Sequence, residues 1–324
     1  MKTVISTDRV AAVELLRKGE VVALPTETVY GLAGNALNPI AVAKIFEAKE
    51  RPRFDPLIVH LPNREWIDRI ADIPAEDRQL IGNLIHKFWP GPFTMVLPKR
   101  QIVPDIVTAG LDTVALRLSA HHVFAEIVSE LNEPLAAPSA NRFGCISPTT
   151  AQHVLDELDE RIPLIVDAGP TEHGIESTIV AVQNGKIAIL RLGPITEQQL
   201  SQFADVTGVI ATERISSPGQ LPSHYAPKTR LHLIDDAKDF FPKQAQRVGL
   251  LAWKSSGGSA GIAKRFAVVR NLSDRGELRE AAANLFRYLR ELDALGLDLI
   301  VAERVPSQGL GAAIMDRLER ASHR

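Results

Sequence analysis

The sequence predicts an α/β protein with a mixed sheet, followed by a second and smaller α/β domain. Over the first 200 residues, short apolar runs typical of buried strands lie between helical patterns. The Asn184-Gly185 pair between two apolar runs indicates an antiparallel hairpin, which makes the first sheet mixed. Beyond residue 230, strands and helices alternate again, as in a small Rossmann-like parallel sheet.

Composition limits the classes of protein that the chain can belong to. Its 324 residues are 45% hydrophobic, which suffices for two ordinary domains. Lys and Arg total 37 and Asp and Glu total 39, so the net charge of -2 leaves no general basic excess for nucleic-acid binding. The single cysteine, Cys145, excludes an internal disulfide and indicates a reducing compartment. Without a signal-peptide pattern or an apolar run of membrane-spanning length, we expect a cytoplasmic protein without membrane contact.

A helix is predicted between the first two apolar runs. Asn38 is a favourable N-cap, and Pro39 suits the first helical position because its missing N–H would have no partner there. The pattern ends at Lys49, whose charge suits the C-terminal end of the helix dipole. An apolar stripe predicts that the buried face consists of Ile40, Ala43, Phe46 and Ala48.

The hairpin at Asn184-Gly185 determines which residues of its two strands face each other. A two-residue turn places Arg191 opposite Thr178, which brings Ser177, Thr178 and Arg191 to one edge of the sheet. The strands predicted for the first domain, hairpin included, are Val21–Leu24, Pro56–Leu61, Phe93–Leu97, Val114–Leu118, Leu164–Val166, Ser177–Val182 and Lys186–Leu192.

The character of the sequence changes near residue 200. Residues 216–227 are rich in turn formers and lack periodicity, which predicts a linker or an extended loop. The glycine-rich segment 257–261 suits either a phosphate-binding nest of N–H groups or a surface loop. We therefore expect three parts, namely residues 1–203, a linker at 204–229 and a Rossmann-like domain at 230–324. The elements predicted for the last part are the strands Leu231–Ile234, Val248–Trp253, Phe266–Val269 and Leu299–Val301 and the helices Glu277–Leu295 and Gly311–Ala321.

Several common catalytic motifs are missing from the sequence. There is no G-x-x-x-x-G-K-[ST] loop and no complete G-x-G-x-x-G fingerprint, which argues against a P-loop enzyme and a standard dinucleotide site. The nine histidines show no metal-ligand spacing with cysteines or carboxylates, so no residue is expected to bind a metal directly. No G-x-S-x-G elbow supports a serine hydrolase.

Arg117 is the first candidate binding residue. In the strand-like stretch Thr113–Ser119 it shares a face with Thr113, Ala115 and Ser119. An arginine within a strand must reach solvent or find an anion, because an unpaired buried charge is very costly. The spacing alone leaves open an exposed sheet face with a solvated arginine and an arginine that binds an anionic ligand.

Two further segments carry groups suited to anions. The basic cluster Lys49–Arg53 either complements the helix dipole or binds an anion beside the sheet. The strand that follows it ends in His60, which suits either a ligand or the backbone. Hydroxyl, amide and N–H groups in Pro138–Thr149 suit phosphate or sugar oxygens, or else turns and a helix cap. Singly, none of these signals identifies a function.

The order of the motifs along the chain is more specific than any one of them. It resembles the YrdC-type family over about residues 1–200. The resemblance implies a mixed, twisted sheet with helices around a concave, anion-binding cavity. The segments that carry it are Ala23–Leu32, Lys49–Pro52, Pro56–His60, Trp89–Thr94, Arg117, Pro138–Asn141, Glu176–Val180 and Leu190–Gly193.

Two later segments, Ser217–Pro227 and Gly309–Leu318, look like those of the longer family members, which add a linker and a Rossmann-like domain. The resemblance implies synthesis of L-threonylcarbamoyladenylate from L-threonine, bicarbonate and ATP, with release of pyrophosphate. This is the first step in forming threonylcarbamoyl-adenosine next to the anticodon of tRNA. The product would pass to a tRNA threonylcarbamoyl-transferase complex, and Mg²⁺ is expected with the ATP.

The resemblance also implies roles for single residues. Lys49 and Arg51 are expected to be catalytic by handling phosphate, and Tyr225 of the linker to close over the nucleotide. The expected L-threonine-binding residues are Thr28, His60, Arg117, Ala137 and Ser177. The expected ATP-binding residues are Arg51, Asp55, Thr113, Ser139, Asn141, Ser147, Arg191 and Tyr225, of which Asp55 stands where relatives often carry small or amide residues.

The main alternative is an RNA- or ribosome-binding protein that uses the basic concavity of a YrdC-type domain. It predicts salt-dependent RNA affinity and no need for threonine. The net charge of -2 and the hydroxyl-rich motifs favour the synthase, with weak RNA binding at most. Carbamoyl transfer from carbamoyl phosphate is a third possibility, but proteins of that kind carry zinc-finger-like cysteines, whereas this chain has one cysteine.

Overall fold

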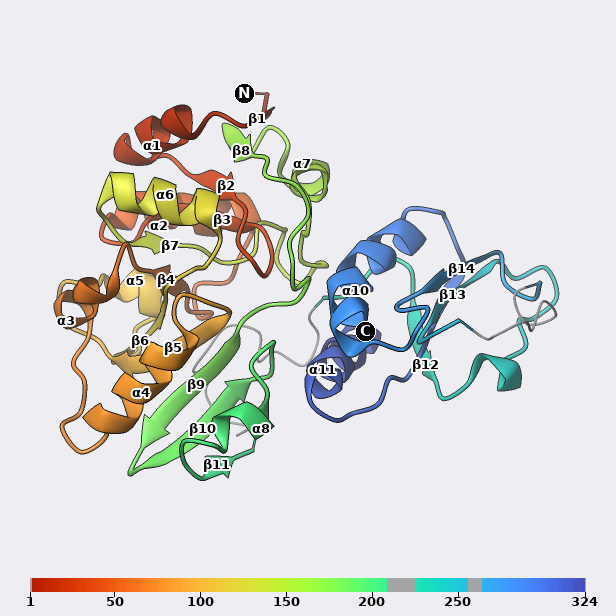
Figure 1. Ribbon diagram of the computed structural model, residues 1–324. Coiled ribbons are helices and arrows are strands. Elements are labelled where there is room, and N and C mark those ends of the chain that lie inside the picture. Colours follow the sequence, from red (N-terminus) through yellow and green to blue (C-terminus); the bar gives the residue numbers. More distant parts are fainter. Residues whose placement is uncertain (1, 209–224, 256–263, 324) are drawn as a thin grey trace. The chain divides into compact units, whose positions relative to one another are not determined.

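The computed structural model describes residues 2–208, 225–255 and 264–323. The chain divides into two compact units (Figure 1). The first comprises Met1–Phe143, Pro148–Glu172 and Glu176–Gln220, and the second Gly144–Ser147, His173–Ile175 and Leu221–Arg324. Most of the expected linker at 204–229 and all of the glycine-rich segment 257–261 lie outside the described residues, so the division at 203 and 229 and the closing role of the linker stay predictions.

A mixed sheet of 11 strands forms the centre of the first unit, in the order β1-β8-β2-β3-β7-β4-β6-β5-β9-β10-β11. Strand β6 is parallel to β4 on one side and antiparallel to β5 on the other, as expected for the predicted mixed sheet. The strands are β1 Val4–Ser6, β2 Val22–Leu24, β3 Gly31–Asn35, β4 Ile58–His60, β5 Phe93–Pro98, β6 Thr113–Arg117, β7 Leu135–Ala136, β8 Leu164–Val166, β9 Thr178–Gln183, β10 Lys186–Arg191 and β11 Val206–Thr207.

The strands predicted for this unit are confirmed to within two residues at each end. Strands β1, β3, β7 and β11 were not predicted. The sequence of β3, Gly-Leu-Ala-Gly-Asn, contains two glycines and no β-branched residue, so its strand propensity is low. It forms because the buried β2 and β7 supply backbone partners on both of its sides.

Helices cover both faces of this sheet. Helices α1 and α6 pack on one face through Leu16, Phe124 and Ile127, next to Val22 of β2. The other face packs against α2, α4 and α7 in a separate core. The helices of the first unit are α1 Arg9–Arg17, α2 Pro39–Lys49, α3 Ile67–Ile70, α4 Arg78–Phe88, α5 Asp105–Thr108, α6 His122–Leu131, α7 Ala151–Leu158 and α8 Glu197–Leu200, with a 3-10 turn, η1, at Arg64–Trp66.

Helix α2 begins and ends as predicted but buries a different face. The Asn38 side chain accepts a hydrogen bond from the N–H of Ile40 at 3.0 Å, which confirms the N-cap. The predicted stripe is wrong in its first half, because Ile40 is 71% exposed and Ala43 is exposed as well. All four residues of the first turn after Pro39 are apolar, so the pattern could not select a face. The buried residues are Ala41, Val42, Ile45, Phe46, Ala48 and Lys49.

The hairpin of β9 and β10 forms around Asn184-Gly185, but its register is not the predicted one. Arg191 pairs with Ile179, whereas the sequence placed it opposite Thr178. The register shifts between Ile189 and Arg191, where β10 carries one extra residue. A bulge of this kind is invisible to a count of residues from the turn, because nothing in an apolar strand marks the inserted residue.

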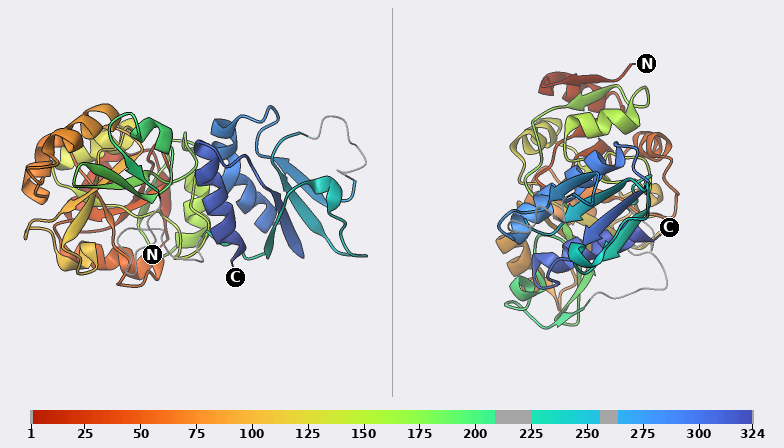
Figure 2. Two further views of the ribbon diagram at one scale, coloured as in Figure 1. Left: turned by 90° about the horizontal axis from the view of Figure 1, so that it is seen from below. Right: turned by 90° about the vertical axis from the view of Figure 1, so that its right-hand side faces the viewer.

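The second unit contains a four-stranded parallel sheet in the order β12-β15-β13-β14, which confirms the predicted Rossmann-like outline. Helices α10 and α11 lie together on one face of this sheet (Figure 2). Among the helices of the described ranges, none combines the length and the apolarity needed to cross a bilayer. The elements are β12 Leu231–Ile234, η2 Ala237–Asp239, β13 Val248–Ala252, β14 Val268–Asn271, α10 Leu278–Asp293, β15 Leu299–Glu303 and α11 Leu310–Ser322.

Candidate active site

The register of the large sheet places five residues in one cross-strand row. His60 of β4 pairs with Arg117 of β6, which pairs with Thr94 of β5. Thr94 pairs with Ile179 of β9, and Ile179 with Arg191 of β10. Directly paired residues share a face. The predicted threonine-binding residues His60 and Arg117 and the predicted nucleotide-binding residue Arg191 therefore lie on one face, spread over about 19 Å at roughly 4.8 Å per strand.

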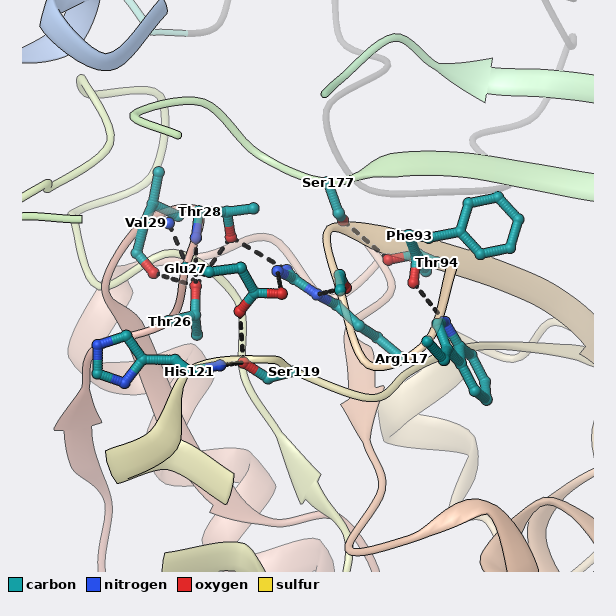
Figure 3. Close-up of polar contacts among 12 residues, drawn as sticks. Thr26, Glu27, Thr28, Val29, Phe93, Thr94, Arg117, Ser119, His121 and Ser177 are labelled. Carbon is teal, nitrogen blue, oxygen red and sulfur yellow. Dashed lines mark hydrogen bonds and ion pairs between the residues drawn. The ribbon is translucent and has the colours of Figure 1, made fainter. Parts of the chain in front are cut away.

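Arg117 is 3% exposed and is held on three sides. Its Nε donates to the carbonyl of Gly91 at 3.2 Å, and Nη1 donates to the Thr28 hydroxyl at 3.1 Å. Its Nη2 lies 2.8 Å from Oε1 of Glu27 (Figure 3). The structure thus brings together Thr28 and Arg117, which the sequence assigned to the same ligand. It also identifies an anion for the buried arginine, which is a carboxylate of the protein itself.

Glu27 belongs to the loop that joins β2 to β3, and sequence reasoning did not select it as a site residue. Burial alone would raise the pKa of this carboxyl, but the charge of Arg117 and a hydrogen bond from the Ser119 hydroxyl outweigh burial and lower the pKa to about 2. In the same loop the Thr26 hydroxyl pairs with that of Thr28 at 2.8 Å. One feature of the sequence could have indicated that Glu27 is a site residue. It is a carboxylate between two threonines, Thr26 and Thr28, just after a buried strand.

His60 is 1% exposed and lies next to Arg117 in the cross-strand row. Burial and, to a smaller extent, the positive charge of Arg117 lower its pKa to about 3, so the ring is neutral at physiological pH. Its Nδ1 has no hydrogen-bond partner among the described residues. The ring contacts that of Phe124, with centroids 4.7 Å apart. A neutral imidazole with an unpaired nitrogen suits the predicted contact with a small polar ligand.

Ser177 connects the predicted threonine and nucleotide positions. Its hydroxyl pairs with that of Thr94 at 2.8 Å and accepts from Nη2 of Arg191 at 3.0 Å (Figure 3 shows the Thr94 contact). The Nε of Arg191 donates to the Ser177 carbonyl at 3.0 Å. Thr94 is fully buried and was missed at the sequence level, because it reads as one more alternating residue of β5. The bulge of β10 is what sets Arg191 against this serine.

Lys49 joins two of the predicted motifs. Its Nζ donates to the backbone carbonyls of Ser139 and Asn141, both at 2.5 Å, and its side chain is buried. Asn141 is buried as well, and its amide donates to the carbonyl of Arg142 at 2.8 Å. The K-x-R and S-x-N motifs are thus in contact, and the lysine fixes the loop that presents Ser139. Its predicted contact with phosphate stays a prediction.

Arg51 forms a buried ion pair with Asp55, with Nη2 2.9 Å from Oδ2. The same guanidinium donates to the carbonyls of Asp55 and Pro56 at 3.1 and 2.9 Å, which closes the turn after α2. Burial raises the pKa of Asp55, although the charges of Arg51, Lys49 and Arg191 act in the opposite direction. Arg51, Lys49 and Arg191, the three cations predicted to bind phosphate, therefore all act to lower the pKa of the same carboxylate.

The carboxylate of Asp55 also bears on the expected Mg²⁺. Its Oδ1 is buried without a hydrogen-bond partner among the described residues. No three His, Cys, Asp or Glu side chains gather at a metal-binding position in the described ranges. A single carboxylate such as that of Asp55 is enough for a Mg²⁺ that arrives with ATP, because such an ion keeps several waters and uses one or two carboxylates besides the phosphates. Asp55 is the carboxylate that would hold it here, which departs from the expectation that no residue binds a metal directly.

The remaining predicted residues divide between the two units. Ala137 is buried, and its N–H donates to the carbonyl of Ile58 at 3.0 Å. Thr113 begins β6 on the face of Arg117, about 13 Å along the strand from it. Ser147 and Tyr225 belong to the second unit, where the ring of Tyr225 stacks on Phe286 with centroids 5.4 Å apart. The roles of Ser147 and Tyr225 at a nucleotide stay predictions.

Comparison with known proteins shows that both parts of the chain match models of known protein families. A family model described as "Telomere recombination", for Sua5, YciO and YrdC, matches residues 14–193. A second, described as "Threonylcarbamoyl-AMP synthase, C-terminal domain", matches residues 195–323. The chain is 38% identical to the threonylcarbamoyl-AMP synthase of Pyrococcus abyssi, covering 97% of this chain and 93% of that protein. It is 40% identical to the enzyme of that name from Bacillus subtilis, covering 96% and 92%.

A solved structure agrees with these sequence relatives. The fold matches that of P. abyssi Sua5 complexed with L-threonine, with a TM-score of 0.86, 34% identity and coverage of 99% of this chain and 98% of that one. The match extends over both units of the chain. On the evidence of its ordered motifs, its sheet topology and these relatives, the chain belongs to the Sua5/YciO/YrdC family, as a member that carries the threonylcarbamoyl-AMP synthase C-terminal domain.

Proposed function

We propose that this protein is an enzyme that synthesises threonylcarbamoyl-AMP. The observation that carries the proposal is its similarity, over nearly the whole length of both chains, to two threonylcarbamoyl-AMP synthases at 38% and 40% identity. The likeness to Sua5 complexed with L-threonine supports L-threonine as the amino-acid substrate. Bicarbonate and ATP are proposed as the other two substrates.

The proposed reaction forms two bonds. The amine nitrogen of threonine takes up the carbon of bicarbonate with loss of water, which gives an N-carboxylate. An oxygen of this carboxylate attacks the α-phosphorus of ATP, and the bond from that phosphorus to the β-phosphate oxygen breaks. Pyrophosphate leaves with the electron pair. Such a sequence needs no protein nucleophile, so the protein must position anions, neutralise their charge and exclude water.

The buried site of the first unit has the groups for this task. Arg117, whose planar guanidinium suits a carboxylate, lies in one row with His60 and Arg191. Lys49 and Arg51 are buried near Asp55, and both have charges suited to phosphate. We propose that Arg117, Thr28 and His60 bind threonine, while Lys49, Arg51 and Arg191 face the nucleotide phosphates. A Mg²⁺ bound with ATP would supply further neutralisation of the phosphates, with Asp55 on its protein side.

The product is a mixed anhydride, which hydrolyses readily, so we propose that it passes directly to a tRNA threonylcarbamoyl-transferase complex. This would be the first step towards threonylcarbamoyl-adenosine in tRNA, in the cytoplasm. RNA binding as the primary function is not favoured, because the relatives are named as synthases and the net charge is -2.

A single incubation tests the proposal. Purified protein with ATP, L-threonine, bicarbonate and Mg²⁺ should release pyrophosphate, and mass spectrometry should find threonylcarbamoyl-AMP. Omission of any one of the three substrates should abolish the release. Pyrophosphate that appears at the same rate without threonine and bicarbonate would contradict the proposal.

A further inference from the structure

The buried pair of Glu27 and Arg117 places opposite charges side by side at the proposed carboxylate-binding position. The two side chains are 5% and 4% exposed, with Nη2 of Arg117 2.8 Å from Oε1 of Glu27. They come from different parts of the chain, the β2–β3 loop and the end of β6, and meet beside Ser119 (Figure 3). An arginine alone would attract any carboxylate, whereas this arginine is accompanied by a carboxylate of the protein.

The pair still has hydrogen-bonding capacity for a ligand. The Nε and Nη1 atoms of Arg117 are used by Gly91 and Thr28. Nη2 of Arg117 and Oε1 of Glu27 face each other at 2.8 Å as an ion pair, and each can take part in a further hydrogen bond, since Nη2 carries two hydrogens and a carboxylate oxygen has two lone pairs. One donor atom and one acceptor atom, adjacent and of opposite charge, are therefore available in a buried site.

Glu27 is an anion at every physiological pH. The Ser119 hydroxyl donates to Oε2, and Ser119 lies two residues beyond Arg117 along the same chain segment. The carboxylate therefore carries a fixed charge and is too weak a base to remove a proton from the substrate ammonium. Its effect on a ligand must be electrostatic and constant.

A buried pair of zero net charge accepts a ligand of zero net charge at lower cost than it accepts an anion. An amino acid is a zwitterion, whose carboxylate suits Arg117 and whose ammonium suits Glu27. The same acid without its amino group brings an uncompensated negative charge next to Glu27, and like charges in a desolvated site repel strongly. We propose that Glu27 is a specificity determinant, which makes the Arg117 position selective for an α-amino acid over a carboxylic acid that lacks the amine.

This inference rests on the proposed function, since it takes Arg117 as the receptor of the threonine carboxylate. A purely structural role for Glu27 makes a different prediction. A buried ion pair contributes little net stability, but loss of one partner disturbs its surroundings. Such a disturbance would weaken binding of an amino acid and of its amine-free analogue alike. Selectivity between the two ligands therefore separates the two roles.

The experiment compares L-threonine with (R)-3-hydroxybutanoate, which is threonine without its amino group. Dissociation constants for both are measured by calorimetry on the full-length wild-type protein and on Glu27→Gln, which keeps the shape and removes the charge. The wild type should bind threonine at least about 100-fold more tightly than the analogue. In Glu27→Gln this ratio should fall about tenfold or more, chiefly through tighter binding of the analogue.

The matched control is Glu126→Gln, because Glu126 is also paired with an arginine, Arg9, but at the surface. This variant should keep the wild-type ratio. An unchanged ratio in Glu27→Gln would overturn the inference. If Glu27→Gln does not fold, the wild type alone decides, since equal binding of the two ligands overturns the inference and a ratio near 100-fold supports it. A wild type that binds neither ligand would instead contradict the proposed function.

Discussion

Three groups of the protein hold the guanidinium of Arg117, so the residue is positioned in advance. Its backbone partner at Gly91, its hydroxyl partner Thr28 and its ion-pair partner Glu27 fix the plane of the guanidinium. Binding then costs little side-chain entropy, which is the usual advantage of preorganisation. Residue-level changes that keep the charge of Arg117 should therefore act mainly on substrate affinity, whereas loss of either charge of the buried pair should also weaken the fold.

We expect Arg117→Lys to raise the KM for L-threonine while leaving the KM for ATP nearly unchanged. Lysine keeps the charge but loses the planar fork, which should weaken threonine binding by about 1.5–3 kcal/mol. Steady-state pyrophosphate release with each substrate varied in turn measures both constants. Arg9→Lys, at an exposed ion pair, is the control. An equal rise in both KM values would indicate general disruption and contradict the assignment.

The buried His60 should make stability depend on pH. Its folded pKa is about 3 and its ordinary value is 6.5, so between these values the unfolded chain binds a proton that the folded chain does not. Stability should therefore fall as the pH drops below 6.5, by up to about 1.4 kcal/mol per pH unit. Urea unfolding at pH 7 and pH 5 should show a larger loss for the wild type than for His60→Gln.

The control for this experiment is His86→Gln, in an exposed position on α4. It should show the same pH dependence as the wild type. Glu27 should also make the protein less stable in acid, but at lower pH than His60. Its ionised carboxylate stabilises the fold above pH 4.5, and this stabilisation is lost as the pH falls towards its folded pKa of about 2. Equal pH dependence in the wild type and His60→Gln would contradict a neutral buried histidine.

At the scale of elements, the close approach of the segment after β10 to the start of β9 sets the position of Ser177. A Cβ at Gly193 would lie 2.4 Å from the N of Thr178 and 2.6 Å from the carbonyl carbon of Ser177. Both neighbours are backbone atoms, so no side chain can turn away to make room. Glycine at this position is a requirement of the hairpin's packing.

We expect Gly193→Ala to lower the free energy of unfolding by about 1–3 kcal/mol and to reduce synthase activity, because it pushes Ser177 away from Thr94 and Arg191. Gly82→Ala is the matched control, since Gly82 is exposed within α4 and a Cβ there meets nothing within 4 Å. That variant should be more stable by about 1 kcal/mol and fully active. Urea titrations and pyrophosphate assays test both, and a fully active Gly193→Ala would show that Ser177 is not displaced.

At the scale of the whole molecule, ligand binding should appear as added stability. The apolar cores of the first unit surround a polar row, and a ligand that binds only the folded state stabilises it by mass action. At 100 times its dissociation constant, L-threonine should add about 2.7 kcal/mol to the free energy of unfolding. Thermal unfolding should then shift upwards by several degrees, roughly 2–4 °C per kcal/mol. D-threonine is the control, and an identical shift with both enantiomers would argue against a shaped site.

Much of the fold could be predicted from local signals. The strand from Leu164 to Val166, the Asn38 N-cap and the parallel sheet of the second unit all depend on short-range preferences of the chain. The order of the motifs was enough to predict the family. The sequence could not predict strand β3, because its glycines carry no strand preference and only its neighbours make it a strand.

The sequence by itself determined which residues are candidates for contact with an anionic ligand, because Arg117, His60 and Lys49 stand in recognisable motifs. The tertiary structure alone decided what those residues contact. It set Glu27 against Arg117, tied Lys49 to two carbonyls and shifted Arg191 by one position through a bulge. The physical reason is that burial and pairing of charges depend on contacts between segments tens of residues apart, which no local preference encodes.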